Sequence, residues 1–186
     1  MISTKDQILQ LADELILNKG FNAFSFADIS ERLGIKKASV HYHFASKEQL
    51  GVSLVKYHTD KTKLLFDQKS DLSAIGRLLT FFEIYEQRHQ LSQVCLVGSL
   101  GTDFYTIPDS MQAELKELSN VILNGLTDIL IDGKRENTFR FADQPRTKAL
   151  MIITNLLGGL QLSRLTGTDD FETIKRSILD NLLYKQ

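Results

Sequence analysis

Apolar residues recur at helical spacing along most of the chain. In the first segment Ile8, Leu11, Ala12, Leu15 and Ile16 fall on one face of a helix. Comparable stripes cover about residues 47–69, 71–90, 108–131 and 144–166, and a last one follows Thr168. The chain has only two prolines, and no segment convincingly alternates apolar and polar residues as a strand would. The pattern predicts an all-α fold.

Two short helices joined by a tight turn are predicted between residues 25 and 43. A Ser-x-x-Asp capping box at Ser25 starts a helix over residues 26–33, and Gly34 can end it in the left-handed conformation. A second helix is predicted over residues 36–43. Helices joined in this way cross steeply, which leaves the exposed face of the second free to enter a major groove. The segment therefore predicts a helix-turn-helix DNA reader.

The side chains of this segment suit contacts with DNA. Lysines bind phosphates, while hydroxyls and imidazoles bind phosphates or base edges. The formal net charge is only −1, but seven basic and two acidic residues lie between positions 32 and 63, so a local basic face is expected. The predicted DNA contacts are Ser25, Lys36, Lys37, Ser39, His41, Tyr42, His43 and Lys47.

Residues 1 to about 56 resemble the N-terminal domain of the TetR family of transcriptional repressors. The family usually has a tyrosine where His41 stands, and Tyr42 fills a variable position. The resemblance implies a three-helix DNA-binding domain over residues 1–48, joined by a long helix to a helical ligand-binding and dimerisation domain over residues 49–186. The matching residues are Gly20-Phe21, Ser25, Ile29, Ser30, Leu33-Gly34-Ile35, Lys37-Ala38-Ser39, His43-Phe44 and Ser46-Lys47-Glu48-Gln49-Leu50.

The helices over about 108–131 and 144–166 are predicted to form the surface of a homodimer. The second is apolar nearly all round, so it needs partners on more than one side. Its Gly158-Gly159 pair would either let another helix approach closely or kink the helix. A dimer also follows from the reader, because one recognition helix contacts only a few base pairs. The predicted interface residues are Leu118, Ile122, Leu126, Ile153, Leu157, Gly158 and Leu160.

A small-molecule pocket is expected where aromatic and polar residues mix inside apolar helices, although each such residue could equally belong to the core. The segment that begins at Cys95 is similar to the part of some TetR-family members that senses electrophiles through a cysteine. A lone cysteine can also be an inert small hydrophobe, while a reactive one needs cationic neighbours such as Arg88 or His89. The candidates for ligand binding or sensing are Phe66, Phe82, Tyr85, His89, Cys95, Phe104, Tyr105, Asn155 and Gln161.

Other classes of protein are not supported. The four histidines and the single cysteine show no metal-binding spacing, and no glycine-rich phosphate loop follows a strand, so no enzyme, metal or cofactor is predicted. Acidic residues interrupt any signal peptide at the N-terminus, and the longest apolar run is too short to span a bilayer. One cysteine fits a reducing compartment, so we expect a cytoplasmic protein without a membrane partner.

The function predicted from these features is that of a ligand-responsive transcriptional repressor. It would bind a palindromic operator in double-stranded DNA as a homodimer and be released by a small-molecule or electrophile inducer. The alternative is a helical module that binds small molecules or other proteins but does not bind DNA.

Overall fold

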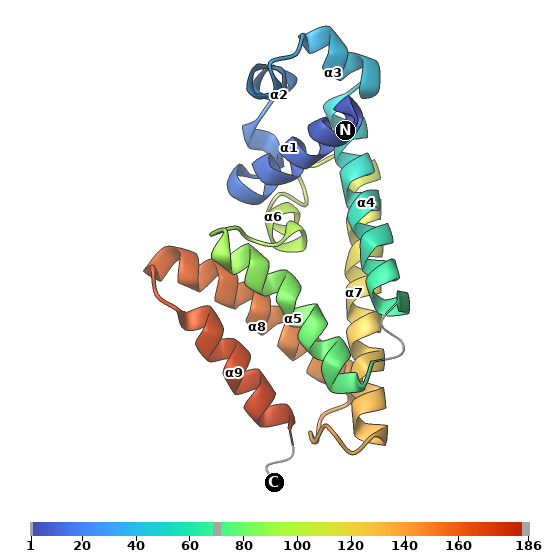
Figure 1. The fold of residues 1–186 in the computed structure, drawn as a ribbon, viewed down its shortest axis with the longest axis vertical. Helices are drawn as coiled ribbons and strands as arrows, with labels where there is room; N and C mark the ends of the chain where they lie inside the picture. Colours follow the sequence, from blue (N-terminus) through green and yellow to red (C-terminus); the bar gives the residue numbers. More distant parts are fainter. Residues whose placement is uncertain (1, 69–71, 184–186) are drawn as a thin grey trace. The chain divides into compact units, whose positions relative to one another are not determined.

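The computed structural model describes residues 2–68 and 72–183, and within them the chain is almost entirely helical. An isolated β-bridge pairs Phe139 with Leu183. The predicted all-α class is confirmed (Figure 1). The elements are α1 (Thr4–Lys19), the 3₁₀ turn η1 (Phe21–Ala23), α2 (Phe26–Leu33), α3 (Lys37–His43), α4 (Lys47–Gln68), α5 (Ala74–Gln90), α6 (Leu96–Thr102), α7 (Asp109–Arg135), α8 (Pro145–Thr166) and α9 (Asp170–Leu182).

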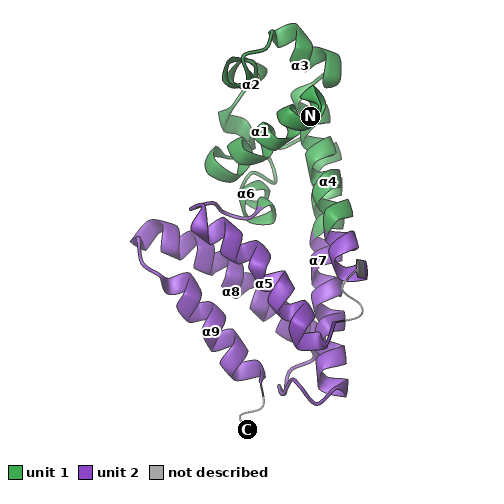
Figure 2. Cartoon of the chain, viewed as in Figure 1, with its two compact units in different colours: residues 1–61, 96–118 green, residues 62–95, 119–186 purple. Residues whose placement is uncertain are grey.

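The chain forms two compact units (Figure 2). Unit 1 consists of Met1–Lys61 and Leu96–Leu118, and unit 2 consists of Thr62–Cys95 and Ser119–Gln186. Unit 1 thus joins α1–α3 and most of α4 with α6 and the first turns of α7. The sequence predicted a DNA-binding domain over residues 1–48 and a ligand-binding and dimerisation domain over residues 49–186. That division is by function, whereas the two units are defined by packing, so it stays a prediction.

Unit 1 is built around α1. Ser3 begins this helix by accepting a hydrogen bond from the Asp6 backbone at 3.2 Å. The predicted apolar stripe of α1 is buried, and α2, α3 and α6 pack against the helix. The buried hydroxyl of Ser99 on α6 donates to the carbonyl oxygen of Ile16 at 2.7 Å. The side chains of this unit therefore hold α6 directly on the helix that supports α2 and α3.

Unit 2 has a core supplied by α5, α7, α8 and α9. Its fully buried residues include Leu78, Phe82, Leu126, Leu156 and Phe171, each with no exposed surface. Burying a large apolar side chain stabilises a fold by about 1.5–3 kcal/mol. The helices of unit 2 are therefore held by their shared apolar faces.

In the described part of the chain, no helix is both long and apolar enough to cross a membrane.

The predicted end of α7 near residue 131 is wrong. The helix continues through Gly133 to Arg135. A Cβ atom at position 133 would overlap the ring of Phe139, which is 2% exposed. The glycine is thus needed inside the helix to admit a ring from the following loop.

Candidate nucleic-acid interface

The capping box that begins α2 has formed as predicted. The Ser25 backbone N–H donates to Asp28 Oδ2 at 2.7 Å, and the Ala27 N–H donates to Ser25 Oγ at 3.2 Å. The hydrogen bonds from Ser25 stabilise the carboxylate, so the pKa of Asp28 is lowered from its ordinary value of 3.8. Gly34 follows the helix in the left-handed conformation, with φ of 63°. Both ends of α2 are therefore set by residues next to it in the sequence.

Helix α3 has a buried face and an exposed face. Val40 has no exposed surface, and Phe44, just past the helix, is 1% exposed, so these two side chains anchor α3 inside unit 1. The opposite face carries Ala38 and Tyr42, and Lys37 lies at the start of the helix; all three residues are exposed. Because Ala38 is small, this face can approach another molecule closely. The exposed face of α3 has the properties required of a recognition helix.

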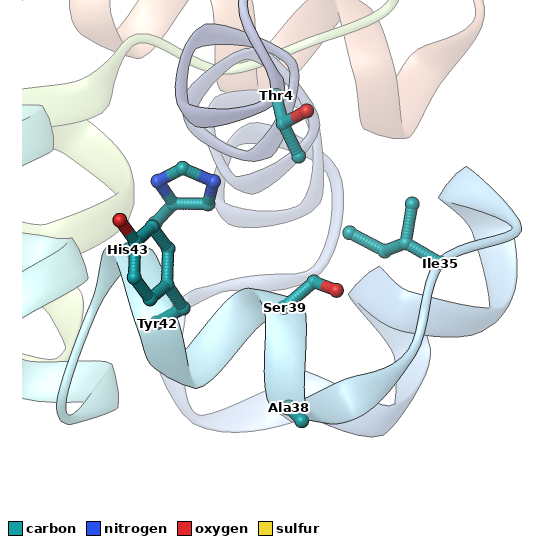
Figure 3. Close-up of a pocket in the computed structure, with 6 residues that line it drawn as sticks. All are labelled: Thr4, Ile35, Ala38, Ser39, Tyr42 and His43. Carbon is teal, nitrogen blue, oxygen red and sulfur yellow. The ribbon is translucent and has the colours of Figure 1, made fainter.

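A hollow lies between the start of α1 and α3 (Figure 3). Thr4 faces it from α1, while Ile35 and Ser39 point toward it from the other side. The Tyr42 and His43 rings lie next to each other at one end, with centroids 5.1 Å apart. The wall of this hollow therefore carries hydroxyl and imidazole groups, which bind phosphates or base edges.

The neighbouring rings of His41 and Tyr42 have different surroundings. The His41 ring packs edge-on against Phe26, with centroids 4.9 Å apart. The Tyr42 side chain is 86% exposed, the second most exposed of the large hydrophobic residues described after Tyr105. Tyr42 is therefore free to contact another molecule, while His41 is partly engaged in holding α3 against α2.

The three predicted lysine contacts also differ. Lys36 and Lys37 are exposed, and neither forms an ion pair with any residue that the structure describes. Lys47 instead points into unit 1, where its Nζ donates to the Phe24 carbonyl oxygen at 2.5 Å. Partial burial lowers the pKa of Lys47. The first two lysines are available to phosphates, whereas the ammonium group of Lys47 already has a partner in the protein.

Four of the predicted ligand-binding residues come together in unit 2. Phe66, Phe82, Tyr85 and Cys95 all belong to or pack against its core. Burial raises the pKa of Tyr85 well above its ordinary value of 10.0, and the neighbouring Cys95 contributes to the shift. Phe81, which is not among the predicted ligand-binding residues, lies between them: the centroid of its ring is 6.3 Å from that of Phe66, 6.3 Å from that of Phe82 and 5.3 Å from that of Tyr85. In the sequence, Phe81 is one of several apolar residues of α5, and nothing in the pattern distinguishes it from an ordinary core residue.

The other ligand candidates lie elsewhere. In unit 1, Phe104 lies beneath the Lys116 ammonium at 5.4 Å, and Tyr105 is 93% exposed. In unit 2, Asn155 and Gln161 are exposed on α8, and Asn155 borders a shallow hollow between α8 and α9. The structure therefore does not gather all nine candidates into one pocket.

The two basic residues predicted beside Cys95 have other partners. His89 contacts Asp169 at 3.1 Å and stacks on Phe171, with centroids 5.0 Å apart. Arg88 donates to the Gln93 side chain at 3.0 Å. Cys95 itself is partly exposed and packs against the core of unit 2.

The predicted dimer residues fall into three groups. Leu118, Leu126 and Leu160 are at most 3% exposed, so their side chains belong to the interior of the chain. Ile122, Ile153 and Leu157 are partly buried against the core of unit 2. A Cβ atom at Gly158 would meet nothing within 4 Å, while one at Gly159 would meet Ile174 of α9 at 3.1 Å. The exposed apolar residues of α8 are Leu150, Met151, Leu162 and Leu165.

Comparisons with known proteins agree with this geometry. Residues 8–54 match the family described as bacterial regulatory proteins, tetR family. The crystal structure of a TetR transcriptional regulator from Legionella pneumophila is 35% identical and superposes with a TM-score of 0.86 over 98% of each chain.

Two curated proteins add to the comparison. The biofilm operon icaADBC negative transcriptional regulator IcaR of Staphylococcus aureus strain Newman is 40% identical over 126 residues, which cover 62% of this chain and 67% of IcaR. The transcriptional repressor NemR of Escherichia coli K12 is 20% identical over 183 residues, which cover 94% of this chain and 90% of NemR. Similar proteins thus include two that are named as a repressor or negative regulator of transcription.

Proposed function

The chain belongs to the TetR family of transcriptional regulators, and from this premise we propose that it is a ligand-responsive repressor that binds a palindromic operator as a homodimer. The observation that carries the proposal is the exposed face of α3. Val40 and Phe44 anchor this helix from behind, and its lysines, hydroxyls and Tyr42 ring face outward. Groups of these kinds bind the phosphates and base edges of double-stranded DNA.

We assign the DNA contacts to two kinds of groups. Lys36 and Lys37 contact phosphates, because both are exposed and neither has an ionic partner in the described residues. Ser39, Tyr42 and His43 line the hollow beside α1 and reach base edges or sugar–phosphate oxygens. The small side chain of Ala38 allows α3 to lie deep in the major groove.

The homodimer is formed through the outer face of α8. Leu162 and Leu165 are 52% and 80% exposed, and Leu150 and Met151 lie earlier on the same helix with 45% and 46% exposure. Covering these side chains with a second copy would remove apolar surface from water, which favours association. Gly158, with nothing close to it, permits a near approach of the partner helix. Two-fold symmetry then places the recognition helices in successive major grooves, about 34–36 Å apart.

A ligand releases the DNA by stabilising a dimer in which this separation is wrong. The ligand must bind the non-binding form of the dimer more tightly than the DNA-binding form by several kcal/mol. A ligand with equal affinity for both forms would not change the equilibrium between them. The inducer would act by one of two routes: reversible binding beside the aromatic cluster of unit 2, or modification of Cys95, which packs against the same core. Similarity to NemR, which is named a transcriptional repressor, supports the proposal that this chain represses transcription.

The experiment is a titration of the DNA upstream of the gene for this chain, before and after treatment with a thiol-reactive electrophile. Cys95→Ser serves as the matched control, because it changes one atom of a partly exposed side chain. Release of the wild type but not of the mutant assigns the sensor to Cys95. If both proteins still bind the DNA after treatment, sensing of electrophiles through Cys95 is excluded. The inducer would then be a small molecule that binds reversibly.

A further inference from the structure

Lys47 is surrounded by aromatic rings although it is the first residue of a helix in a basic segment. Its Nζ lies 4.6 Å from the centroid of the Phe21 ring and 4.3 Å from that of Phe24. The same ammonium group donates to the Phe24 carbonyl oxygen at 2.5 Å. A cation over two ring faces and a carbonyl oxygen makes attractive contacts with all three groups. We call Lys47, Phe21 and Phe24 the aromatic clamp.

The aromatic clamp joins the start of α4 to the segment between α1 and α2. Phe21 lies in η1, and Phe24 immediately precedes Ser25, the capping residue of α2. The two rings meet edge to face, with centroids 6.1 Å apart. Lys47 is therefore bound to the residue that leads into the first helix of the helix-turn-helix.

A second close approach lies one turn further along α4. A Cβ atom at Gly51 would approach the Phe21 ring to 2.9 Å and would overlap the side chain of Met111 on α7. Met111 has no exposed surface. The Phe21 ring thus packs over two successive turns of α4, and the aromatic clamp sits at the edge of a tightly packed junction.

The charges around Lys47 also direct it inward. Asp28 of the α2 capping box and Asp103, in the loop after α6, both favour the charged form of the lysine. Lys36 and Lys37, by contrast, have no acidic partner among the described residues. An ammonium group held by a carbonyl oxygen, two rings and nearby carboxylates would have to leave these partners to reach a phosphate.

We propose that Lys47 is a positioning residue, which holds α2 and α3 in the orientation that reads DNA without itself contacting a phosphate. This inference rests on the proposed DNA-binding function. It replaces the expectation that Lys47 binds a phosphate beside those bound by Lys36 and Lys37. A misaligned reader would no longer reach base edges, while the lysines that produce non-specific binding remain in place.

The test compares Lys47→Met with Lys37→Met, which is the same chemical change at an exposed lysine of α3. Each full-length protein is titrated with a duplex selected by the wild type from a randomised pool, and with a random-sequence duplex of equal length, at several salt concentrations. Thermal unfolding of each variant shows whether it is folded at the temperature of the titrations.

We expect Lys47→Met to bind the selected duplex about tenfold more weakly, with unchanged affinity for the random duplex and an unchanged salt slope. Lys37→Met should weaken binding to both duplexes and reduce the salt slope by about one, because one lysine no longer neutralises a phosphate. Lys47→Arg, whose guanidinium group also stacks on rings and donates hydrogen bonds, should restore specific binding. Phe24→Leu leaves Lys47 in place but removes one ring, and it should resemble Lys47→Met.

Three results would overturn the inference. A reduced salt slope for Lys47→Met, matching that of Lys37→Met, would show that Lys47 binds a phosphate. A lower unfolding temperature with unchanged binding of both duplexes would reduce the aromatic clamp to a purely stabilising role. If the wild type selects no duplex and binds none in a salt-dependent way, the proposed function fails, and the inference fails with it.

Discussion

The neighbouring residues His41 and Tyr42 show how two adjacent rings on one short helix take different roles. His41 packs edge-on against Phe26 of α2, whereas the Tyr42 ring is directed to solvent. A contact between rings contributes about 0.5–1.5 kcal/mol beyond the area it buries. An exposed ring contributes little to stability until another molecule covers it.

We therefore expect Tyr42→Ala to affect mainly DNA binding and His41→Ala to affect mainly stability. Tyr42→Ala should weaken DNA binding about tenfold and change the free energy of unfolding by less than about 0.5 kcal/mol. His41→Ala should lower the free energy of unfolding by about 1 kcal/mol, because the ring that packs on Phe26 is removed. Urea unfolding and DNA titration of both variants provide the two measurements. A destabilised Tyr42→Ala variant with normal DNA binding would show that the two roles are reversed.

The carboxylate of Asp28 makes the stability of α2 depend on pH. Its pKa is lowered in the folded protein by the hydrogen bonds from Ser25, so its contribution is complete above the ordinary pKa of 3.8 and disappears as the pH falls through the lowered value. Asp28→Asn should therefore be less stable than the wild type at neutral pH, and this difference should shrink in acid. Urea unfolding of both proteins across that range tests the prediction, and a difference that is constant with pH would contradict it.

At the scale of elements, the most accurate predictions concern helices whose ends are marked locally. The capping box and Gly34 gave the bounds of α2, and Pro145 in the first turn marked the start of α8. The exposure of Tyr42, predicted as a DNA contact on α3, also agrees with the structure. These features depend on residues a few positions apart, which is the range over which a sequence pattern is informative.

Other features depend on residues that are distant in the sequence. The hydrogen bond between Lys47 and Phe24 spans 23 positions, so a lysine at a helix start looked like an ordinary phosphate ligand. The alternation of buried and exposed leucines on α8 was hidden because that helix is apolar nearly all round. In both cases the sequence identified the element, but tertiary packing decided the direction of the side chain.

The close approach of Gly133 and Phe139 provides a test at the element scale. Gly133→Ala should lower the free energy of unfolding by about 1–3 kcal/mol, because the new methyl group overlaps the buried Phe139 ring. Phe139→Ala should cost about 3–5 kcal/mol through the removal of that ring. In the double variant the alanine at position 133 has room, so the combined destabilisation should be smaller than the sum of the two. Strict additivity in urea unfolding would show that the overlap is not the cause.

At the scale of the whole molecule, the homodimer is the feature on which operator binding depends. Leu165 is 80% exposed on α8, so its replacement should not disturb the fold of one chain. Leu165→Glu should therefore give a folded monomer that binds the operator far more weakly, because one recognition helix contacts only half of a palindrome. Leu91→Glu places the same charge at another leucine, 62% exposed, outside α8, and should remain a dimer. Sedimentation of the two variants distinguishes them, and a dimeric Leu165→Glu protein would rule out this face of α8.

The central claim is that the exposed face of α3 reads double-stranded DNA, and the most direct test is a titration of the wild-type chain with the region upstream of its own gene. We predict saturable binding that is stronger than binding to a scrambled duplex and that weakens steeply as salt is added, since lysines that bind phosphates release counterions. Absence of binding, or equal affinity for both duplexes at every salt concentration, would contradict the claim and favour a helical module that does not read DNA.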